Sequence, residues 1–189
     1  IAIELKKLRP DIIIVMGGPQ ASATAAKTLE AIDCIDYICT SEGELTVVPF
    51  FNCILRENCA GIETIPGLHY RVEGKPTYNN IEVPLCDLNT LPFWDERLTA
   101  VDDCSPNMDD GSYFMNIDVG RGCPFNCSFC SASYFWRRLY RLKSKERIIE
   151  ELEYYKNKYG IYTFGFSHDA FTINKKLVEE ICDLALKGR

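Results

Sequence analysis

A repeated order of strand, loop and helix in the C-terminal half constrains the fold of this chain more than any other feature. Residues 113–119 alternate apolar and polar side chains, which predicts a strand. The next apolar stripe begins after Ser144 and stops at Gly160, so it predicts a helix with ordinary end signals. A second strand over residues 161–167 precedes a second helix that Asn174 can cap. Two successive βα units predict parallel strands with right-handed crossovers.

The loop after the first of these strands carries three cysteines, Cys123, Cys127 and Cys130, in the run Gly-Arg-Gly-Cys-Pro-Phe-Asn-Cys-Ser-Phe-Cys. Ligands of such folds bind at the carboxyl ends of the strands, where this loop lies. A structural zinc ion normally takes four protein ligands, and a cubane iron–sulfur cluster has four irons to fill. Three close thiolates suggest a cluster that leaves one iron open. A zinc site with a distant fourth ligand, or three unrelated thiols, remains the alternative.

Cys-x3-Cys-x2-Cys on the loop after the first strand of a βα repeat resembles the motif of the radical S-adenosylmethionine (SAM) enzymes. The resemblance implies that Cys123, Cys127 and Cys130 bind three irons of a 4Fe-4S cluster, and that SAM chelates the fourth. It also implies that Phe129 packs near the adenine of SAM. One-electron reduction, from a donor such as flavodoxin or ferredoxin, would then cleave SAM to a 5′-deoxyadenosyl radical that attacks a small-molecule substrate.

The end of the second strand reads Gly-Phe-Ser-His-Asp and finishes at Asp169. In many radical SAM enzymes this place meets the amino group of the bound methionine. By that resemblance Asp169 would accept a hydrogen bond from the ammonium group, and Ser167 would bind nearby, although a turn or capping role for Asp169 stays open. His168 is interpreted as a polar loop residue. The basic run that ends at Lys143 predicts a solvated face, unless one of its members reaches the carboxylate of the ligand.

The N-terminal third predicts a second set of parallel strands. Residues 11–16 form an apolar run typical of a strand buried on both faces, and they lead directly into Gly17-Gly18-Pro19. Ser22 or Thr24 is expected to begin the following helix. A second strand over residues 35–39 precedes a Glu-Gly-Glu loop and a helix to about residue 58. This is a doubly wound layout, whose glycine loop lies where such folds receive ligands.

The order of Gly-Gly-Pro, an Asp-containing strand and Glu-Gly-Glu upstream of the cysteines resembles the cobalamin-binding class of radical SAM proteins. In that class a Rossmann-like domain precedes the barrel. The resemblance implies that Gly17 and Gly18 let the backbone approach the nucleotide tail of cobalamin. It places Glu42, Gly43 and Glu44 in a loop near the domain junction. Cobalamin is therefore expected as a further cofactor.

These patterns predict an α/β chain in three parts. Residues 1–61 would be the C-terminal part of a Rossmann-like domain of the cobalamin-binding type, and residues 62–112 a connector with a small hairpin that turns at Gly74. Residues 113–189 would be the first two βα units of a radical SAM partial TIM barrel. Two such units cannot close a barrel, so we expect a piece of a longer enzyme that is inactive alone.

Composition excludes several classes of protein. A net charge of −6 and a pI near 5.0 argue against electrostatic binding of nucleic acid. No apolar run reaches the length of a membrane span, and no signal peptide is recognisable. Ten cysteines would suggest disulfides in a secreted protein, but the clustered triad and the lack of a signal peptide favour a reducing, cytoplasmic location. Seven of them show no metal-ligand spacing and are interpreted mostly as small buried hydrophobes: Cys34, Cys39, Cys53, Cys59, Cys86, Cys104 and Cys182.

The expected function is reductive cleavage of SAM by a 4Fe-4S cluster, with cobalamin, for methylation or rearrangement of an unactivated carbon. No catalytic residue beyond the cluster ligands is assigned. The alternative is a non-catalytic iron–sulfur or zinc-binding module, which a fourth protein ligand would favour.

Overall fold

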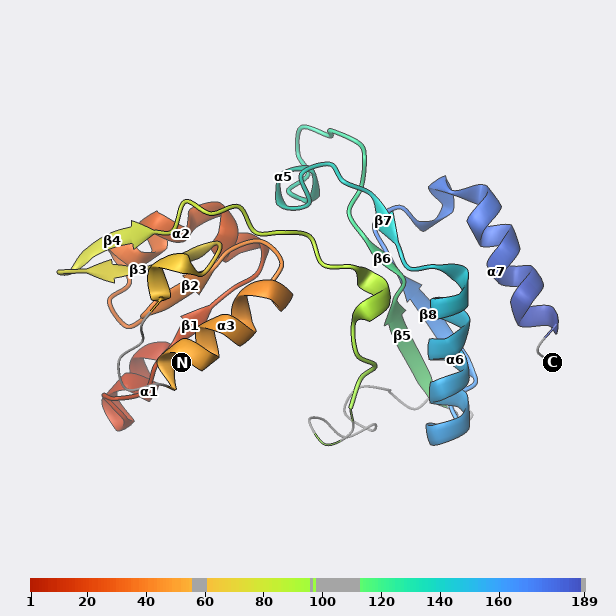
Figure 1. Cartoon of the computed structure of the whole chain (residues 1–189), viewed down its shortest axis with the longest axis horizontal. Coiled ribbons are helices and arrows are strands. Elements are labelled where there is room, and N and C mark those ends of the chain that lie inside the picture. The colour runs from red at the N-terminus through yellow and green to blue at the C-terminus, as the bar shows by residue number, and fades with distance from the viewer. Residues whose placement is uncertain (56–60, 96, 98–112, 188–189) are drawn as a thin grey trace. The chain divides into compact units, whose positions relative to one another are not determined.

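The computed structural model describes residues 1–55, 61–95, 97 and 113–187, and the predictions for helix end 56–58 and for connector residues 98–112 lie outside this part. The chain divides into two compact units, residues 1–86 and 87–189 (Figure 1). Both units combine helices with short strands, so the predicted α/β class is confirmed. None of the described helices is long and apolar enough to cross a membrane.

The first unit is built on a four-stranded sheet in the order β1-β2-β3-β4. Its strands are β1 (Val15–Met16), β2 (Tyr37–Cys39), β3 (Leu68–Val72) and β4 (Lys75–Tyr78). β1 and β2 are parallel, while β3 adds antiparallel to β2 and forms a hairpin with β4. Glu73 and Gly74 turn this hairpin with φ of 50° and 78°, as a type I′ turn requires. The hairpin expected in the connector is thus an integral part of the first sheet.

β1 is shorter than the apolar run over residues 11–16 predicts. The Asp36 carboxylate accepts the Ile14 N–H at 2.7 Å, and Ile14 O accepts the N–H groups of Asp36 and Tyr37. A side chain therefore takes the place of the next ladder bond, and regular pairing begins only at Val15.

The helices of the first unit are α1 (Ala2–Leu8), α2 (Pro19–Ala31), α3 (Glu44–Ile54) and the 3₁₀ turn η1 (Ile62–Thr64). The prediction that Ser22 or Thr24 begins α2 was wrong. Gly18 is the N-cap and Pro19 occupies the first turn, where its fixed φ and missing N–H cost nothing. Along α2 the buried side chains recur at helical spacing and pack on β2, and they are Ala21, Ala25 and Leu29.

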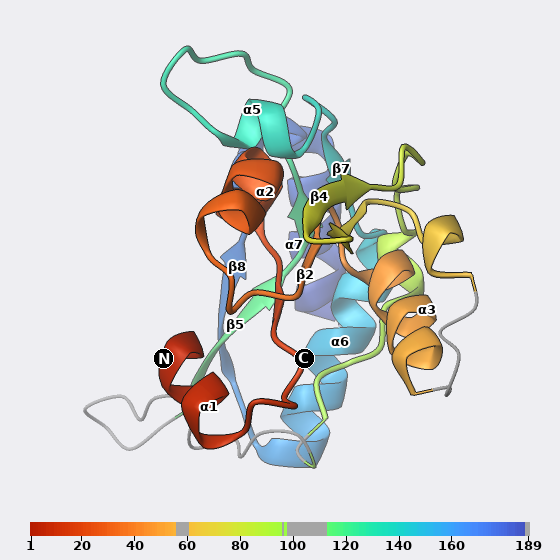
Figure 2. The ribbon, with the colours of Figure 1, turned by 90° about the vertical axis from the view of Figure 1, so that its left-hand side faces the viewer.

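The second unit pairs β5 (Phe114–Asp118) with β8 (Thr163–Ser167) in parallel, and β6 (Gly120–Arg121) with β7 (Arg141–Leu142) antiparallel. Its helices are α5 (Ala132–Phe135), α6 (Lys145–Tyr159) and α7 (Lys175–Lys187), with 3₁₀ turns η2 (Leu88–Thr90) and η3 (Phe171–Ile173). α6 lies alongside the β5–β8 pair in both views (Figures 1 and 2).

The predicted ends of α6 and α7 are confirmed. Ser144 Oγ accepts the Arg147 N–H at 3.1 Å, and Gly160 ends α6 in the left-handed conformation with φ of 68°. Asn174 Oδ1 accepts the Leu177 N–H at 3.1 Å. The core of this unit joins alternate residues of β5 to the inner face of α6, and its buried members are Met115, Ile117, Val119, Ile148, Tyr155, Ile161 and Ile181.

Candidate functional site

The three predicted cluster ligands lie on one loop, residues 122–140, that is closed at its base. β6 and β7 pair there, and the Lys143 N–H donates to Val119 O at 2.9 Å. We call residues 119–121 and 141–143 the neck. The loop therefore leaves β5 and returns to α6 through two hydrogen-bonded chain segments (Figure 1).

Two glycines allow the neck to be this narrow. A Cβ atom on Gly122, whose φ is 83°, would lie 1.8 Å from Leu139 O, and one on Gly120 would lie 2.4 Å from Arg141 O. Real Cβ atoms do not approach backbone atoms so closely, so only glycine fits at either place.

Cys123 is half-buried, whereas Cys127 and Cys130 are exposed, and the Cys130 N–H donates to Cys127 O at 3.1 Å. Thiolates are the donors that iron–sulfur clusters use. The three thiols on this loop fit the ligand chemistry of such a cluster.

The ring of Phe129, predicted to meet the adenine of SAM, lies between Cys127 and Cys130 in sequence and is 90% exposed. A planar ring that is open to solvent beside the thiols is available to a planar ligand. The loop then turns into α5, where Ser133 Oγ donates to Cys130 O at 3.0 Å. This bond ties the third cysteine to the start of the helix.

The end of β8 reaches the neck. Ser167 O accepts the Val119 N–H at 3.3 Å, while the side chains of Ser167 and Asp169 are exposed at this edge. His168 Nδ1 accepts the Ala170 N–H at 2.8 Å, so the ring proton is on Nε2. The same ring meets Tyr140 edge-on, with centroids 5.2 Å apart. The interpretation of His168 as a plain loop residue missed this packing against the loop's returning arm.

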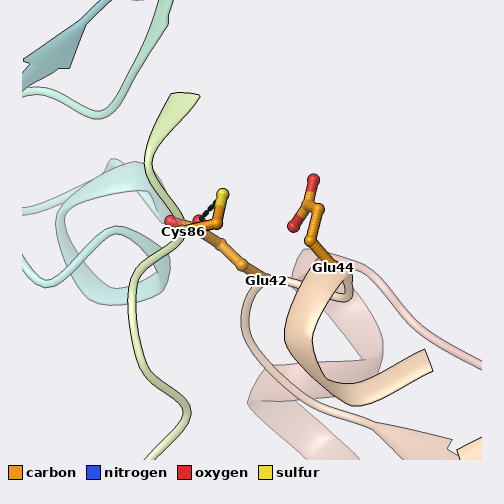
Figure 3. Close-up of side chains that lie close together, drawn as sticks. All are labelled: Glu42, Glu44 and Cys86. Atoms are coloured by element: carbon orange, nitrogen blue, oxygen red, sulfur yellow. Dashed lines mark hydrogen bonds between the residues drawn. The ribbon is translucent and has the colours of Figure 1, made fainter. Parts of the chain in front are cut away.

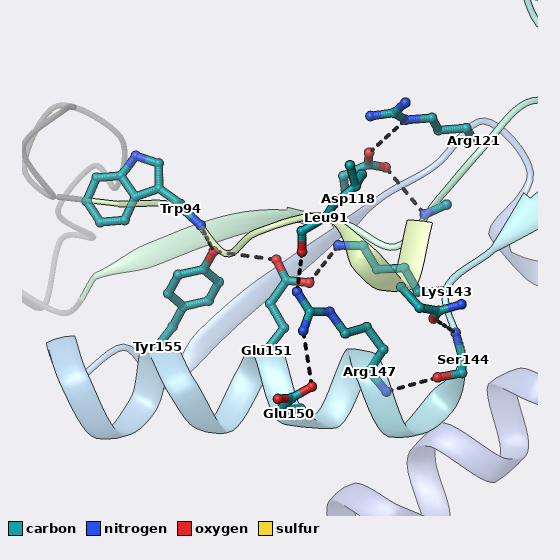
Figure 4. A network of polar contacts seen from close by, with 12 residues as sticks. Leu91, Trp94, Asp118, Arg121, Lys143, Ser144, Arg147, Glu150, Glu151 and Tyr155 are labelled. Atoms are coloured by element: carbon teal, nitrogen blue, oxygen red, sulfur yellow. Dashed lines mark hydrogen bonds and ion pairs between the residues drawn. The ribbon is translucent and has the colours of Figure 1, made fainter. Parts of the chain in front are cut away.

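β5 presents two polar side chains that the sequence analysis left without a role. Asn116 and Asp118 alternate with the buried core residues and are exposed. Asp118 Oδ1 accepts the Gly120 N–H at 3.3 Å, and its Oδ2 lies 3.6 Å from Arg121 Nε (Figure 4). A Cβ on Gly165 of β8 would lie 2.3 Å from Asn116 Oδ1, so glycine makes room for that amide. The strict alternation of residues 113–119 was the signal that could have found both side chains.

A buried ion pair links the neck to α6 (Figure 4). Lys143 Nζ lies 2.6 Å from Glu151 Oε2, and both side chains are less than a tenth exposed. The prediction that Lys143 belongs to a solvated face was wrong, because the neck turns its side chain inward. Burial raises the pKa of Tyr155, one turn along α6, to about 12, and the Glu151 carboxylate adds to this.

These groups border a cavity of about 760 Å³ within the second unit. Its walls come from residues 91–95, from β5 and from α6. The Trp94 N–H donates to Tyr155 Oη at 2.9 Å, which holds residues 91–95 against the helix (Figure 4). The cavity therefore combines an apolar wall with the Lys143–Glu151 pair.

In the first unit, the predicted glycine loop is short. Gly18 has a φ of 91°, and Ser22 Oγ donates to Gly18 O while accepting the Ser41 N–H. Ser22 thus joins the loop after β1 to the loop after β2. The two predicted loops lie side by side at the same edge of the sheet. No ligating side chain comes from Gly17 or Gly18, so this site would act through its backbone.

The Glu-Gly-Glu loop meets a residue that the sequence did not place there. Cys86 Sγ donates to the buried Glu42 carboxylate at 3.3 Å, and one ligating atom each of Glu42, Glu44 and Cys86 lies within 4.8 Å of the others (Figure 3). Gly43 is the N-cap of α3 between the two carboxylates. Cys86 stands 44 residues from Glu42, so no local spacing could have indicated this group.

Comparison with known proteins supports the cysteine motif. Residues 117–188 match the family model of the Radical SAM superfamily. The chain is 34% identical over 184 residues to an uncharacterized methyltransferase of Pyrococcus horikoshii. The aligned region covers 93% of this chain and 37% of that protein. The chain is 28% identical over 194 residues to the anaerobic magnesium-protoporphyrin IX monomethyl ester cyclase of Rubrivivax gelatinosus, covering 96% and 33%.

Solved structures show the same fold. The radical SAM methyltransferase TsrM from Kitasatospora setae, solved with cobalamin and a 4Fe-4S cluster, matches all of this chain and 36% of its own, with a TM-score of 0.69 and 18% identity. The cobalamin-dependent radical SAM enzyme OxsB, with aqua-cobalamin and SAM, matches 98% of this chain and 26% of its own with a TM-score of 0.68 and 19% identity. The chain spans about a third of the length of the relatives it matches. By its cysteine motif, its fold and these matches, the chain belongs to the radical SAM superfamily.

Proposed function

We propose that the protein to which this chain belongs cleaves SAM reductively with a 4Fe-4S cluster and, with cobalamin, methylates or rearranges an unactivated carbon of a small molecule. The observation that carries this proposal is the cysteine loop, which the neck holds at the carboxyl end of the parallel β5–β8 pair. Relatives with methyltransferase and cyclase activities support this reaction class.

In this proposal the chain's own residues have distinct tasks. Cys123, Cys127 and Cys130 hold the cluster as thiolates, and the exposed Phe129 ring offers a face to the adenine of SAM. At the exposed end of β8, Asp169 accepts a hydrogen bond from the ammonium group of the methionine part of SAM, and Ser167 binds nearby. A cluster held by these three thiolates would supply the one-electron reduction that cleaves SAM, with the electron coming from a donor such as flavodoxin or ferredoxin.

The first unit is proposed to contribute to cobalamin binding. The TsrM and OxsB structures contain bound cobalamin, and they match this chain over nearly its whole length. We assign residues 1–61 to the C-terminal part of a Rossmann-like cobalamin-binding domain, and residues 113–189 to the first two βα units of the barrel. The left-handed Gly18 leaves open space where a side chain would stand, so the backbone at Gly17 and Gly18 can approach the nucleotide tail. Glu42 and Gly43 follow β2 at the same edge.

The test uses the longer protein, reconstituted anaerobically with iron and sulfide and reduced with dithionite. It should convert SAM to 5′-deoxyadenosine or S-adenosylhomocysteine, and Cys127→Ala should form neither. Cys182→Ala is the matched control, because Cys182 is also exposed but lies on α7 outside the loop. Electron paramagnetic resonance of the reduced cluster should change when SAM is added, and an unchanged spectrum would reject the radical assignment.

The second candidate is a non-catalytic iron–sulfur or zinc module. Metal analysis separates the two, because a zinc module would hold one zinc and no labile sulfide. A cluster with four protein ligands would leave no iron open for SAM. Such a cluster would survive Cys127→Ala only if another thiol took the place of Cys127.

A further inference from the structure

We propose that the buried Lys143–Glu151 ion pair is a positioning device for the cysteine loop. It sets where the loop's returning arm meets the sheet and so how tightly the three thiolates hold their cluster. This inference rests on the proposed function, because it assumes that the loop carries a cluster.

Lys143 joins the cysteine loop to α6. It is the last residue of the neck, directly after β7 and directly before Ser144, the N-cap of α6. Its N–H donates to Val119 O at 2.9 Å, which fastens the returning arm to the end of β5. Lys143 is thus the residue at which the loop ends and the rigid helix begins.

The side chain of Lys143 is buried against α6. Lys143 Nζ lies 2.6 Å from Glu151 Oε2, and the two side chains are 7% and 8% exposed. Removing either partner leaves an uncompensated buried charge, so the pair tolerates little displacement of the neck relative to α6. An exposed pair would permit such displacement, because water can replace either partner.

Glu151 is itself held in place by a neighbouring side chain. Tyr155 Oη donates to Glu151 Oε1 at 3.4 Å and accepts the Trp94 N–H at 2.9 Å (Figure 4). Arg147, on the same helix, lies with its guanidinium 3.8 Å from the centre of the Phe93 ring and donates to Leu91 O. The segment over residues 91–95 and α6 therefore form one frame, and the ion pair links that frame to the neck.

The experiment compares two lysines near the start of α6 in the full-length protein. Lys143→Met keeps an unbranched side chain one atom shorter than lysine and leaves the backbone bond to Val119 available, but it removes the charge. Lys145→Met is the matched control, because Lys145 pairs with Glu180 of α7 at 2.8 Å. Both variants and the wild type are reconstituted with iron and sulfide, and cluster loss to a chelator is followed by absorbance beside thermal unfolding of the cluster-free forms.

Lys143→Met should lose its cluster about ten- to a hundredfold faster than the wild type, the range typical when a group that orients metal ligands is removed. Its cluster should also show a shifted reduction potential. Lys143→Arg, which keeps the charge, should restore most of the retention, and Lys145→Met should change neither quantity. A general loss of stability would not shift the reduction potential of the cluster, and restoring the charge in Lys143→Arg would not reverse it.

Equal cluster loss in Lys143→Met and Lys145→Met would overturn the inference while leaving the proposed function intact. A wild type that takes up no iron and sulfide would instead overturn the proposed function. If Lys143→Met does not fold, Glu151→Gln carries the comparison, because its amide keeps the shape and removes the charge.

Discussion

Two loops follow the first strand of a parallel pair in this molecule, and they are built in opposite ways. The loop after β1 is only two glycines long, and α2 begins at once at Pro19. The loop after β5 runs through residues 122–140 before α6 begins, and a paired neck closes its base. The first offers only backbone groups to a ligand, while the second offers three thiols and an exposed aromatic ring.

The two loops show that the end of a strand can offer a ligand either backbone groups or side chains. A helix that starts directly after a strand aims its first N–H groups and its positive dipole end at a ligand. A long loop gives up that backbone site and gains freedom to place side chains, but it needs an anchor. The neck glycines and the Lys143–Glu151 pair supply this anchor.

The largest expected contrast is in thiol reactivity. Cys39 ends β2 beside the glycine loop, and burial raises the pKa of its thiol to about 11, so about one thiol in a thousand is ionised at pH 8. Cys127 is exposed on the other loop. Iodoacetamide should therefore modify Cys127 at least about a hundredfold faster than Cys39 in cluster-free protein, as read by peptide mass spectrometry. In urea the two rates should converge, and similar rates in the folded protein would refute the contrast.

Alanine substitutions at Gly18 and Gly122, which both have a positive φ, should separate the stability cost of backbone strain from that of a steric clash. At Gly18 a Cβ would meet nothing within 4 Å, so Gly18→Ala costs only backbone strain, about 1–3 kcal/mol. At Gly122 the Cβ would also lie 1.8 Å from Leu139 O, so Gly122→Ala should cost about 4 kcal/mol or more.

Urea unfolding measures both changes. The tryptophans are Trp94 and Trp136, so indole fluorescence follows the second unit, and circular dichroism follows the whole chain. Gly122→Ala should move the midpoint of the fluorescence transition to a lower urea concentration, whereas Gly18→Ala should leave that midpoint unchanged. A fluorescence shift of equal size in both variants would show that the two loops are not independent.

The smallest expected effect is a pH dependence of the stability of the second unit. Burial holds the pKa of Tyr155 at about 12, above its ordinary value of about 10, so the protonated form is favoured in the folded state. The resulting stability is fully present below pH 10 and is lost as pH rises through 12. Tyr155→Phe should remove this part of the alkaline slope in fluorescence-monitored unfolding, and an unchanged slope would contradict the assignment.

Local signals predicted much of the second unit. The Ser144 and Asn174 caps, the Gly160 stop and the alternation along β5 each depend on neighbours within a few residues, and all are confirmed. The start of α2 was missed because Ser22 and Thr24 look like caps, whereas Pro19 and Gly18 had already fixed the helix start. Ser22 instead connects two loops, a task that its sequence neighbours do not reveal.

The parts of the site that the sequence missed depend on distant partners. Cys86 meets Glu42 across 44 residues, and Trp94 meets Tyr155 across 61. Lys143 looked solvated because its sequence neighbours are basic, yet the paired neck turns it toward Glu151. Periodicity indicates which face of an element is buried, but it does not indicate which residue of another element contacts that face. The cluster and cofactor roles assigned to single residues remain predictions for the experiments above.

The neck has a consequence for how such a chain can change. Because the two arms of the cysteine loop meet again at a paired base, the stretch between them is a closed cassette whose ends stay a fixed distance apart. Insertions, deletions or a transplanted loop from a relative can therefore be accommodated between Gly122 and Tyr140 without moving β5 or α6. A lineage could vary the surroundings of its cysteines in this way while the supporting strand and helix are inherited unaltered.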